Sequence, residues 1–147
     1  MERHSCKTYF AVHFNIDREK NAALIREGRE CKPQDIGIFN CGEVEKFIVE
    51  KLGVTPIWAR HTFIIGLNDK YDVDVNVMLR KTLHNLFGKE ELIKLMQKKF
   101  SVETVLQIVP YIATESDKPN QYLSPESDVI GFLYKSDTAI DIDYYII

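Results

Sequence analysis

Two aspartates lie close together in the apolar stretch TAIDIDYYII, which runs from Thr138 to Ile147. Alternate side chains of a β-strand point to the same face, so a strand here places Asp141 and Asp143 side by side, about 6.5–7 Å apart. Such a pair is typical of half a metal site, of a general acid and base, or of a solvated strand face. Which of these applies depends on the residues that lie near the two carboxylates.

A metal site or an acid–base pair requires more than these two side chains supply. Ca²⁺ and Mg²⁺ take several oxygen ligands, and only Asp72, Asp74 and Asp137 are placed to add any. A catalytic pair needs surroundings that separate the two pKa values, and adjacent positions on one face offer no such asymmetry. We therefore predict no metal, no cofactor and no catalytic residue here. The pair is interpreted as a solvated face that a partner recognises.

The cysteines and histidines show no zinc-binding or catalytic spacing either. Scattered cysteines without close pairs indicate reduced thiols in a cytoplasm. The sequence contains neither a GxSxG nucleophile turn nor a glycine-rich phosphate loop. Isolated histidines are more often surface or satisfied interior residues than catalytic bases. The residues concerned are His4, His13, His61, His84, Cys6, Cys31 and Cys41.

Length and charge limit the class of protein. Of the 147 residues, 45% are apolar and 28% charged, so we expect one globular domain over residues 1–147. The net charge of −3 argues against nucleic-acid binding, and no apolar stretch is long enough for a membrane span. The start, MERHSCKTYF, lacks the apolar core of a secretory signal, which favours a cytoplasmic protein. Seven carboxylates against two lysines between Thr114 and Asp143 favour a basic partner.

Hydrophobic periodicity predicts strands interleaved with helices. The strands alternate between apolar and polar residues, so we expect helices on one face of the sheet and a partly wet second face. The predicted fold class is α+β: two layers, with about four mostly antiparallel strands and helices packed on one face. Pro110 cannot donate a hydrogen bond, so its strand lies at an edge or is bulged. The final strand is expected at the centre or beside the first.

The predicted elements follow from capping and turn signals. They are a strand over Lys7–Ile16, a helix over Arg18–Glu27 ended by Gly28, a helix capped by Asn40 and ended by Gly53, a strand over Pro56–Leu67, two helices with apolar stripes over Val75–Leu86 and Leu92–Phe100, a strand over Val102–Ala113, a helix begun by Ser124 and Pro125, and the final strand.

The C-terminal half of the chain contains a series of motifs. VDVNVMLRKTLHNLFGKEELIKLMQKKF supplies leucine-rich helices, SVETVLQIVPYIA an alternating strand, and YLSPESDVIGFLYKSDTAIDIDYYII a helix before an Asp-apolar-Asp strand. This half resembles a bacterial family known as domain of unknown function 4279, and KLGVTP is similar to a helix end in the family's first half. The resemblance implies the fold and a bacterial source, and places Asp141 and Asp143 in a recurring tail. No activity is established for that family.

Absence of a catalytic pattern favours a non-enzymatic protein-binding domain, for instance an immunity protein or adaptor that docks on a basic toxin through an acidic face. Trp58 and Arg60 share a strand face and are residue types that anchor interfaces. The predicted partner-binding residues are Asp141, Asp143, Glu126, Asp128, Trp58 and Arg60.

Two other functions stay open at this point. The first is a small-molecule-binding or hydrolytic domain with His61 and Cys41 in a cleft between sheet and helices. The second is an RNA-binding sheet with Tyr9, Trp58 and Tyr145 as stacking residues, which the nearby acids disfavour.

Overall fold

The computed structural model describes residues 3–71, 74–115 and 123–147. In chain order the elements are β1 (Ser5–Phe14), α1 (Arg18–Arg26), η1 (Pro33–Ile36), α2 (Cys41–Phe47), η2 (Ile48–Leu52), β2 (Ile57–Ala59), β3 (Thr62–Tyr71), α3 (Val75–Leu83), α4 (Glu90–Phe100), β4 (Val102–Ile112), α5 (Ser127–Lys135), β5 (Ala139–Ile142) and β6 (Tyr145–Ile146).

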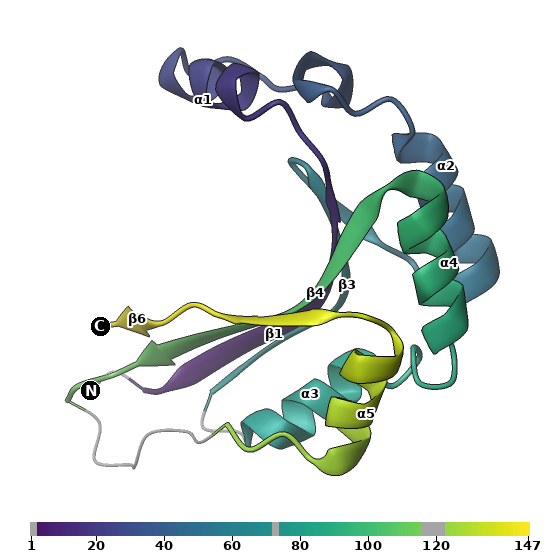
Figure 1. Ribbon diagram of the computed structural model, residues 1–147. Helices are drawn as coiled ribbons and strands as arrows, with labels where there is room; N and C mark the ends of the chain where they lie inside the picture. Colours follow the sequence, from purple (N-terminus) through teal and green to yellow (C-terminus); the bar gives the residue numbers. More distant parts are fainter. Residues whose placement is uncertain (1–2, 72–73, 116–122) are drawn as a thin grey trace.

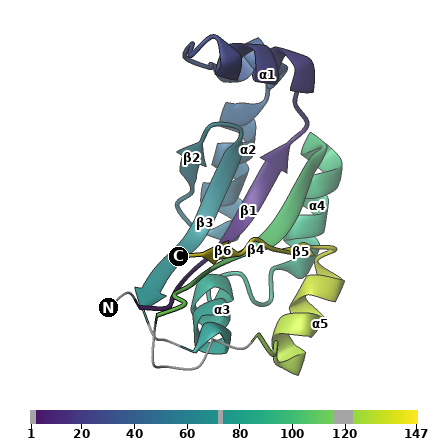
Figure 2. The same cartoon turned by 90° about the vertical axis from the view of Figure 1, so that its left-hand side faces the viewer.

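The sheet is mixed rather than mostly antiparallel in four strands. Its order is β2-β3-β1-β4-β5, with β6 also paired to β4 (Figure 2). The pairings of β2 with β3, of β3 with β1 and of β1 with β4 are antiparallel, whereas β5 and β6 run parallel to β4. The pairing is parallel because α5, which follows β4 in the sequence, carries the chain back to the end of the sheet where β4 begins. β5 then runs in the same direction as β4. The α+β class is thus confirmed. The predicted strand number and the central or β1-adjacent place of the last strand were wrong.

Helices cover one face of the sheet. Helices α2, α3, α4 and α5 pack on the convex side, whereas α1 lies beyond one end of the strands (Figure 1). The core lies between these layers and includes Phe10, Val12, Phe63, Leu106 and Phe132. The opposite face is concave, and in Figure 2 it points toward the viewer. We call this concave surface the open face.

Most of the predicted helices are present, with two differences at their starts. Asn40 is the N-cap residue of α2 as predicted, but its side chain donates to the Phe100 carbonyl instead of capping the first turn, and so ties the start of α2 to the end of α4. Helix α5 begins at Ser127 after Glu126, not at Ser124. Gly53 ends its helix as predicted, with a left-handed φ of 69°.

The predicted strand over Pro56–Leu67 is a hairpin of β2 and β3. The chain reverses at Arg60 and His61, where Arg60 has a φ of 58°. Ile57 therefore lies opposite Ile64, and Trp58 lies opposite Phe63. The reversal breaks the alternation that a single strand would have had, so Trp58 lies in β2 and Arg60 in the turn, and the two do not share a strand face.

A bulge in β3 decides which residues reach the open face. Before it, Ile65 lies opposite Phe10 in the core; after it, Asn68 lies opposite Thr8, with a register shift between Thr8 and Phe10. Gly66 occupies the bulge with a φ of 66°. The extra residue puts Leu67, Asp69 and Tyr71 on the open face.

The last strand is interrupted opposite Pro110. Ile108 and Ile112 direct their carbonyl oxygens toward the last segment, where they accept from the N–H groups of Asp143 and Ile147. Pro110 lies between them in the alternation and has no N–H to offer that segment. The interruption between β5 and β6 is therefore located where the ladder lacks a donor. Pro110 is not on an edge strand, since β4 pairs on both sides.

Candidate functional site

The open face is defined by the strand register. Side chains directly opposite each other on paired strands point to the same face, and those opposite Ala11 and Lys7 point away from the core. The floor at Ala11 is fully buried between longer side chains. The members of the open face are Ser5, Lys7, Tyr9, Ala11, His13, Ile57, Ala59, Thr62, Ile64, Leu67, Asp69, Tyr71, Glu103, Val105, Gln107, Val109, Tyr111, Ala139, Asp141, Asp143 and Tyr145.

Large apolar side chains of this face are accessible to solvent. Ile57 is 56% exposed, Leu67 46%, Tyr71 59% and Tyr145 47%. Exposed apolar and aromatic side chains that gather on one face mark a surface that binds another molecule. We therefore take the open face as the candidate site.

One end of the open face combines tyrosines with the two aspartates. Tyr9 and Asp141 flank Gln107 from neighbouring strands, and the rings of Tyr111 and Tyr145 stack with centroids 5.3 Å apart and planes at 18°. The Tyr145 hydroxyl donates to Asp143 Oδ2 at 3.3 Å. We call Tyr9, Tyr111, Tyr145, Asp141 and Asp143 the tyrosine–aspartate end.

The carboxylates act on the phenols beside them. Burial, followed by the charges of Asp141 and Asp143, raises the pKa of Tyr9 above its usual value. The charge of Asp143 and its hydrogen bond raise the pKa of Tyr145. Both phenols therefore stay protonated at neutral pH, and the negative charge of this end belongs to the aspartates.

The predicted acidic residues separate into two groups. Glu126 and Asp128 lie at the start of α5 in the helix layer, where Arg80 binds both; its Nη2 is 3.0 Å from Asp128 Oδ2. Asp141 and Asp143 lie in the sheet layer, on the open face. Among the described residues, no salt bridge reaches either of these two aspartates.

Trp58 and Arg60 are not brought to the aspartates. The Trp58 ring packs on Phe14 and Phe63, with centroids 5.8 and 4.9 Å away, on the helix side of the sheet. Arg60 lies at the hairpin turn, where its guanidinium donates to the Asn21 side chain of α1 at 2.7 and 3.0 Å. The structure therefore gives Trp58 a packing role and joins Arg60 to α1.

Two histidines lie at the opposite end of the open face. The rings of His13 and His61 have centroids 6.3 Å apart, and His13 Nδ1 lies 2.8 Å from Thr62 Oγ1. Burial and then the neighbouring His61 lower the pKa of His13, against the opposite effects of Glu103 and Asp141. Burial and Arg60 lower the pKa of His61. Both imidazoles are therefore neutral at neutral pH.

An open hollow of about 510 Å³ adjoins the tyrosine–aspartate end. Its lining includes Lys7, Asp69, Tyr71 and Tyr111. The guanidinium of Arg3, also in the lining, lies over the Tyr71 ring with Cζ 5.0 Å from the centroid. A tyrosine of this surface thus already stacks with a guanidinium from the same chain.

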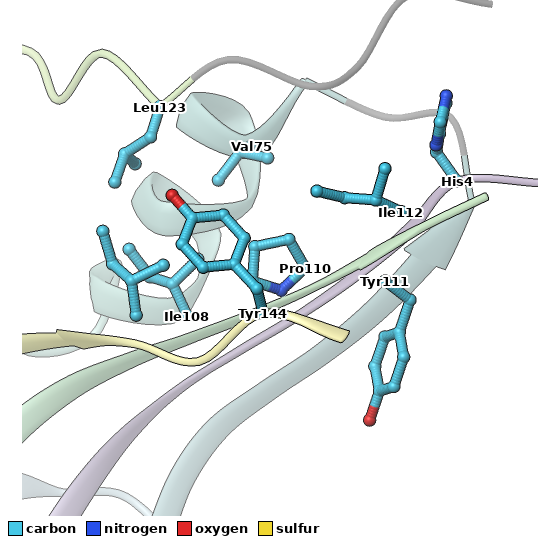
Figure 3. Close-up of a pocket in the computed structure, with 9 residues that line it drawn as sticks. His4, Val75, Ile108, Pro110, Tyr111, Ile112, Leu123 and Tyr144 are labelled. Carbon is cyan, nitrogen blue, oxygen red and sulfur yellow. The ribbon is translucent and has the colours of Figure 1, made fainter. Parts of the chain in front are cut away.

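A second, smaller cavity lies on the helix side near Tyr144. It has a volume of about 60 Å³, and Figure 3 shows the Tyr144 ring beside Pro110 while Tyr111 points away from it. Val75, Leu123 and neighbouring aliphatic side chains complete an apolar lining. Small-molecule sites usually measure about 300–1,000 Å³, so this cavity suits a single apolar group at most.

The residues predicted for a Cys41–His61 site or a metal site do not come together among the described residues. Cys41 begins α2 and packs on the core, whereas His61 lies at the β2–β3 turn beside His13. Within the described ranges, no three His, Cys, Asp or Glu side chains gather to hold a metal ion. Asp72, considered above as a ligand, lies outside the described residues. No helix in the described part of the chain is long and apolar enough to cross a membrane.

Sequence reasoning placed the two aspartates on one face but missed the stacked tyrosines. Tyr111 and Tyr145 come together because β6 pairs in parallel with β4, which alternation alone does not indicate. Comparisons with protein-family models, with curated proteins and with solved structures found no match. The resemblance to domain of unknown function 4279 therefore stays a prediction.

Proposed function

We propose that this protein is a non-enzymatic binding domain that docks a basic segment of another protein on its open face. The observation that supports this most is the placement of Asp141 and Asp143, without a described counterion, beside exposed tyrosines on the face opposite the helices. Apolar and aromatic side chains supply buried area, and the carboxylates favour and orient a basic partner. An immunity protein bound to a basic toxin is one form of this function.

The charge of the open face favours a basic partner over a second copy of this chain. The carboxylates of Asp69, Glu103, Asp141 and Asp143 outnumber the cations of Lys7 and Arg3, and the two histidines add no charge at neutral pH. Two such faces would bring like charges together, which disfavours self-association. The apolar cavity near Tyr144 is too small for an ordinary metabolite. The hollow of about 510 Å³ beside Tyr71 is large enough but open to solvent, whereas ligand pockets bury most of the ligand, so the small-molecule alternative has less support.

The experiment is affinity capture from a bacterial lysate with the tagged full chain and two matched variants. Leu67→Lys places a cation on the open face, and Leu95→Lys places one at a position of similar exposure, 50%, on α4. We expect the tagged chain to capture a stoichiometric basic partner that high salt releases. The Leu67→Lys variant should fail to capture this partner, and the Leu95→Lys variant should still capture it. A partner lost equally from both variants, or an acidic partner, would contradict the proposal.

A further inference from the structure

Among the described residues, no salt bridge reaches Asp141 or Asp143, whereas the pair of Glu126 and Asp128 holds a cation. In the helix layer, one guanidinium, that of Arg80, contacts both Glu126 and Asp128. A guanidinium carries five donors in a planar fork and so can serve two carboxylates at once. Asp141 of β5 and Asp143, which directly follows β5, have no such partner among the described residues.

The tyrosines beside this pair favour the same chemical group. The stacked rings of Tyr111 and Tyr145 present a flat aromatic surface next to Asp143, and Tyr145 is about half exposed. A planar guanidinium can stack on such a ring while the N–H groups at its edge donate to a carboxylate. A lysine ammonium is not planar and interacts with the ring and the carboxylate only as a point charge. Arg3 makes such a cation–π contact with Tyr71 at the neighbouring hollow, with Cζ 5.0 Å from the ring centroid.

We propose that the tyrosine–aspartate end binds an arginine side chain of the basic partner, stacked on Tyr145 and donating to Asp141 and Asp143. This inference rests on the proposed docking function and specifies the group that the open face recognises. Arginine is selected over lysine by the ring surface, and both are attracted by the charge. The two contributions are therefore separable by experiment.

The test compares nona-arginine and nona-lysine peptides, which carry the same charge, by calorimetric titration of the full chain and by amide chemical-shift mapping. A cation–π contact at an exposed site corresponds to about a two- to fivefold preference for nona-arginine. Tyr145→Leu should abolish that preference, and Tyr145→Phe should keep it because the ring remains. Tyr134→Leu removes an exposed tyrosine from α5 and is the matched control. It should change nothing.

The charge contribution has its own control. Asp141→Asn with Asp143→Asn should weaken both peptides, whereas Glu45→Gln with Glu50→Gln, which removes equal charge from the helix layer, should leave the open-face shifts unchanged. Equal affinities of both peptides at the open face, unaffected by Tyr145→Leu, would overturn the arginine inference and leave the docking function standing. If neither peptide shifted open-face amides, both proposals would be wrong.

Discussion

Gly66 offers a direct test of how the sheet and helix layers meet. It lies in the bulge of β3 with a φ of +66°, and a Cβ built on it would be 2.5 Å from the carbonyl oxygen of Thr82. That oxygen belongs to the backbone of α3, which cannot move aside as a flexible side chain can. We therefore predict that Gly66→Ala destabilises the protein strongly.

Two terms contribute to the expected loss. An alanine in the left-handed region costs about 1–2 kcal/mol. A methyl group forced against packed backbone adds about 1–3 kcal/mol. The free energy of unfolding should therefore fall by about 2–5 kcal/mol. Gly28→Ala is the matched control, since Gly28 has a φ of +63° and nothing within 4 Å of its built Cβ. Its loss should be the first term alone, about 1–2 kcal/mol.

Equilibrium unfolding in urea, followed by circular dichroism and by Trp58 fluorescence, measures both variants against the parent. Equal losses for Gly66→Ala and Gly28→Ala would refute the reasoning, because they would show that α3 does not approach the bulge closely. A large loss for Gly66→Ala also bears on the binding surface. The same bulge directs Leu67 and Tyr71 to the open face.

Three further predictions follow from burial. Burial lowers the pKa values of His13 and His61 in the folded protein below 6.5, so their contribution to stability is present above pH 6.5 and is lost as the pH falls through the folded pKa values. Between about pH 7 and about pH 5, urea titrations should therefore show a smaller loss of stability for the double variant His13→Gln with His61→Gln than for the parent. Burial raises the pKa of Cys6 to about 11, so native protein treated with iodoacetamide near pH 8 should show Cys31 labelled and Cys6 unlabelled by mass spectrometry. Trp58→Ala should reduce stability by about 2 kcal/mol and leave the affinity for nona-arginine unchanged; an affinity loss without a stability loss would return Trp58 to the interface.

The parts of the fold set by local pattern were predictable from the sequence. Alternation in β1 put Phe10, Val12 and Phe14 on the core side, as found. Alternation in the last segment put Asp141 and Asp143 on one face, and in the structure burial and then both of these charges raise the pKa of Tyr9. Helix α1 ends before Gly28, as its sequence indicated. These features depend on residues a few positions apart, where periodicity and glycine conformation carry the information.

The parts that depend on unusual backbone or distant pairing were not predictable in this way. The β2–β3 hairpin turns at Arg60 in a left-handed conformation without the asparagine or glycine that usually signals one. The parallel pairing of β5 with β4 brings Asp141 beside Gln107, and no local pattern distinguishes it from antiparallel pairing. The stacked pair of Tyr111 and Tyr145 depends on the parallel pairing of β6 with β4, so the most specific part of the candidate site was missed.

The division of the acidic segment explains why one pair of carboxylates is the better candidate. A basic partner at Glu126 and Asp128 must first displace Arg80, whereas none of the described residues forms a salt bridge with Asp141 or Asp143. An exposed ion pair nevertheless contributes only about 0–1 kcal/mol, so two aspartates alone do not hold a protein partner. Most of the binding free energy must come from apolar and aromatic area buried beside them. The charges then select a basic partner and orient it, and the tyrosines contribute the buried area on which the affinity depends.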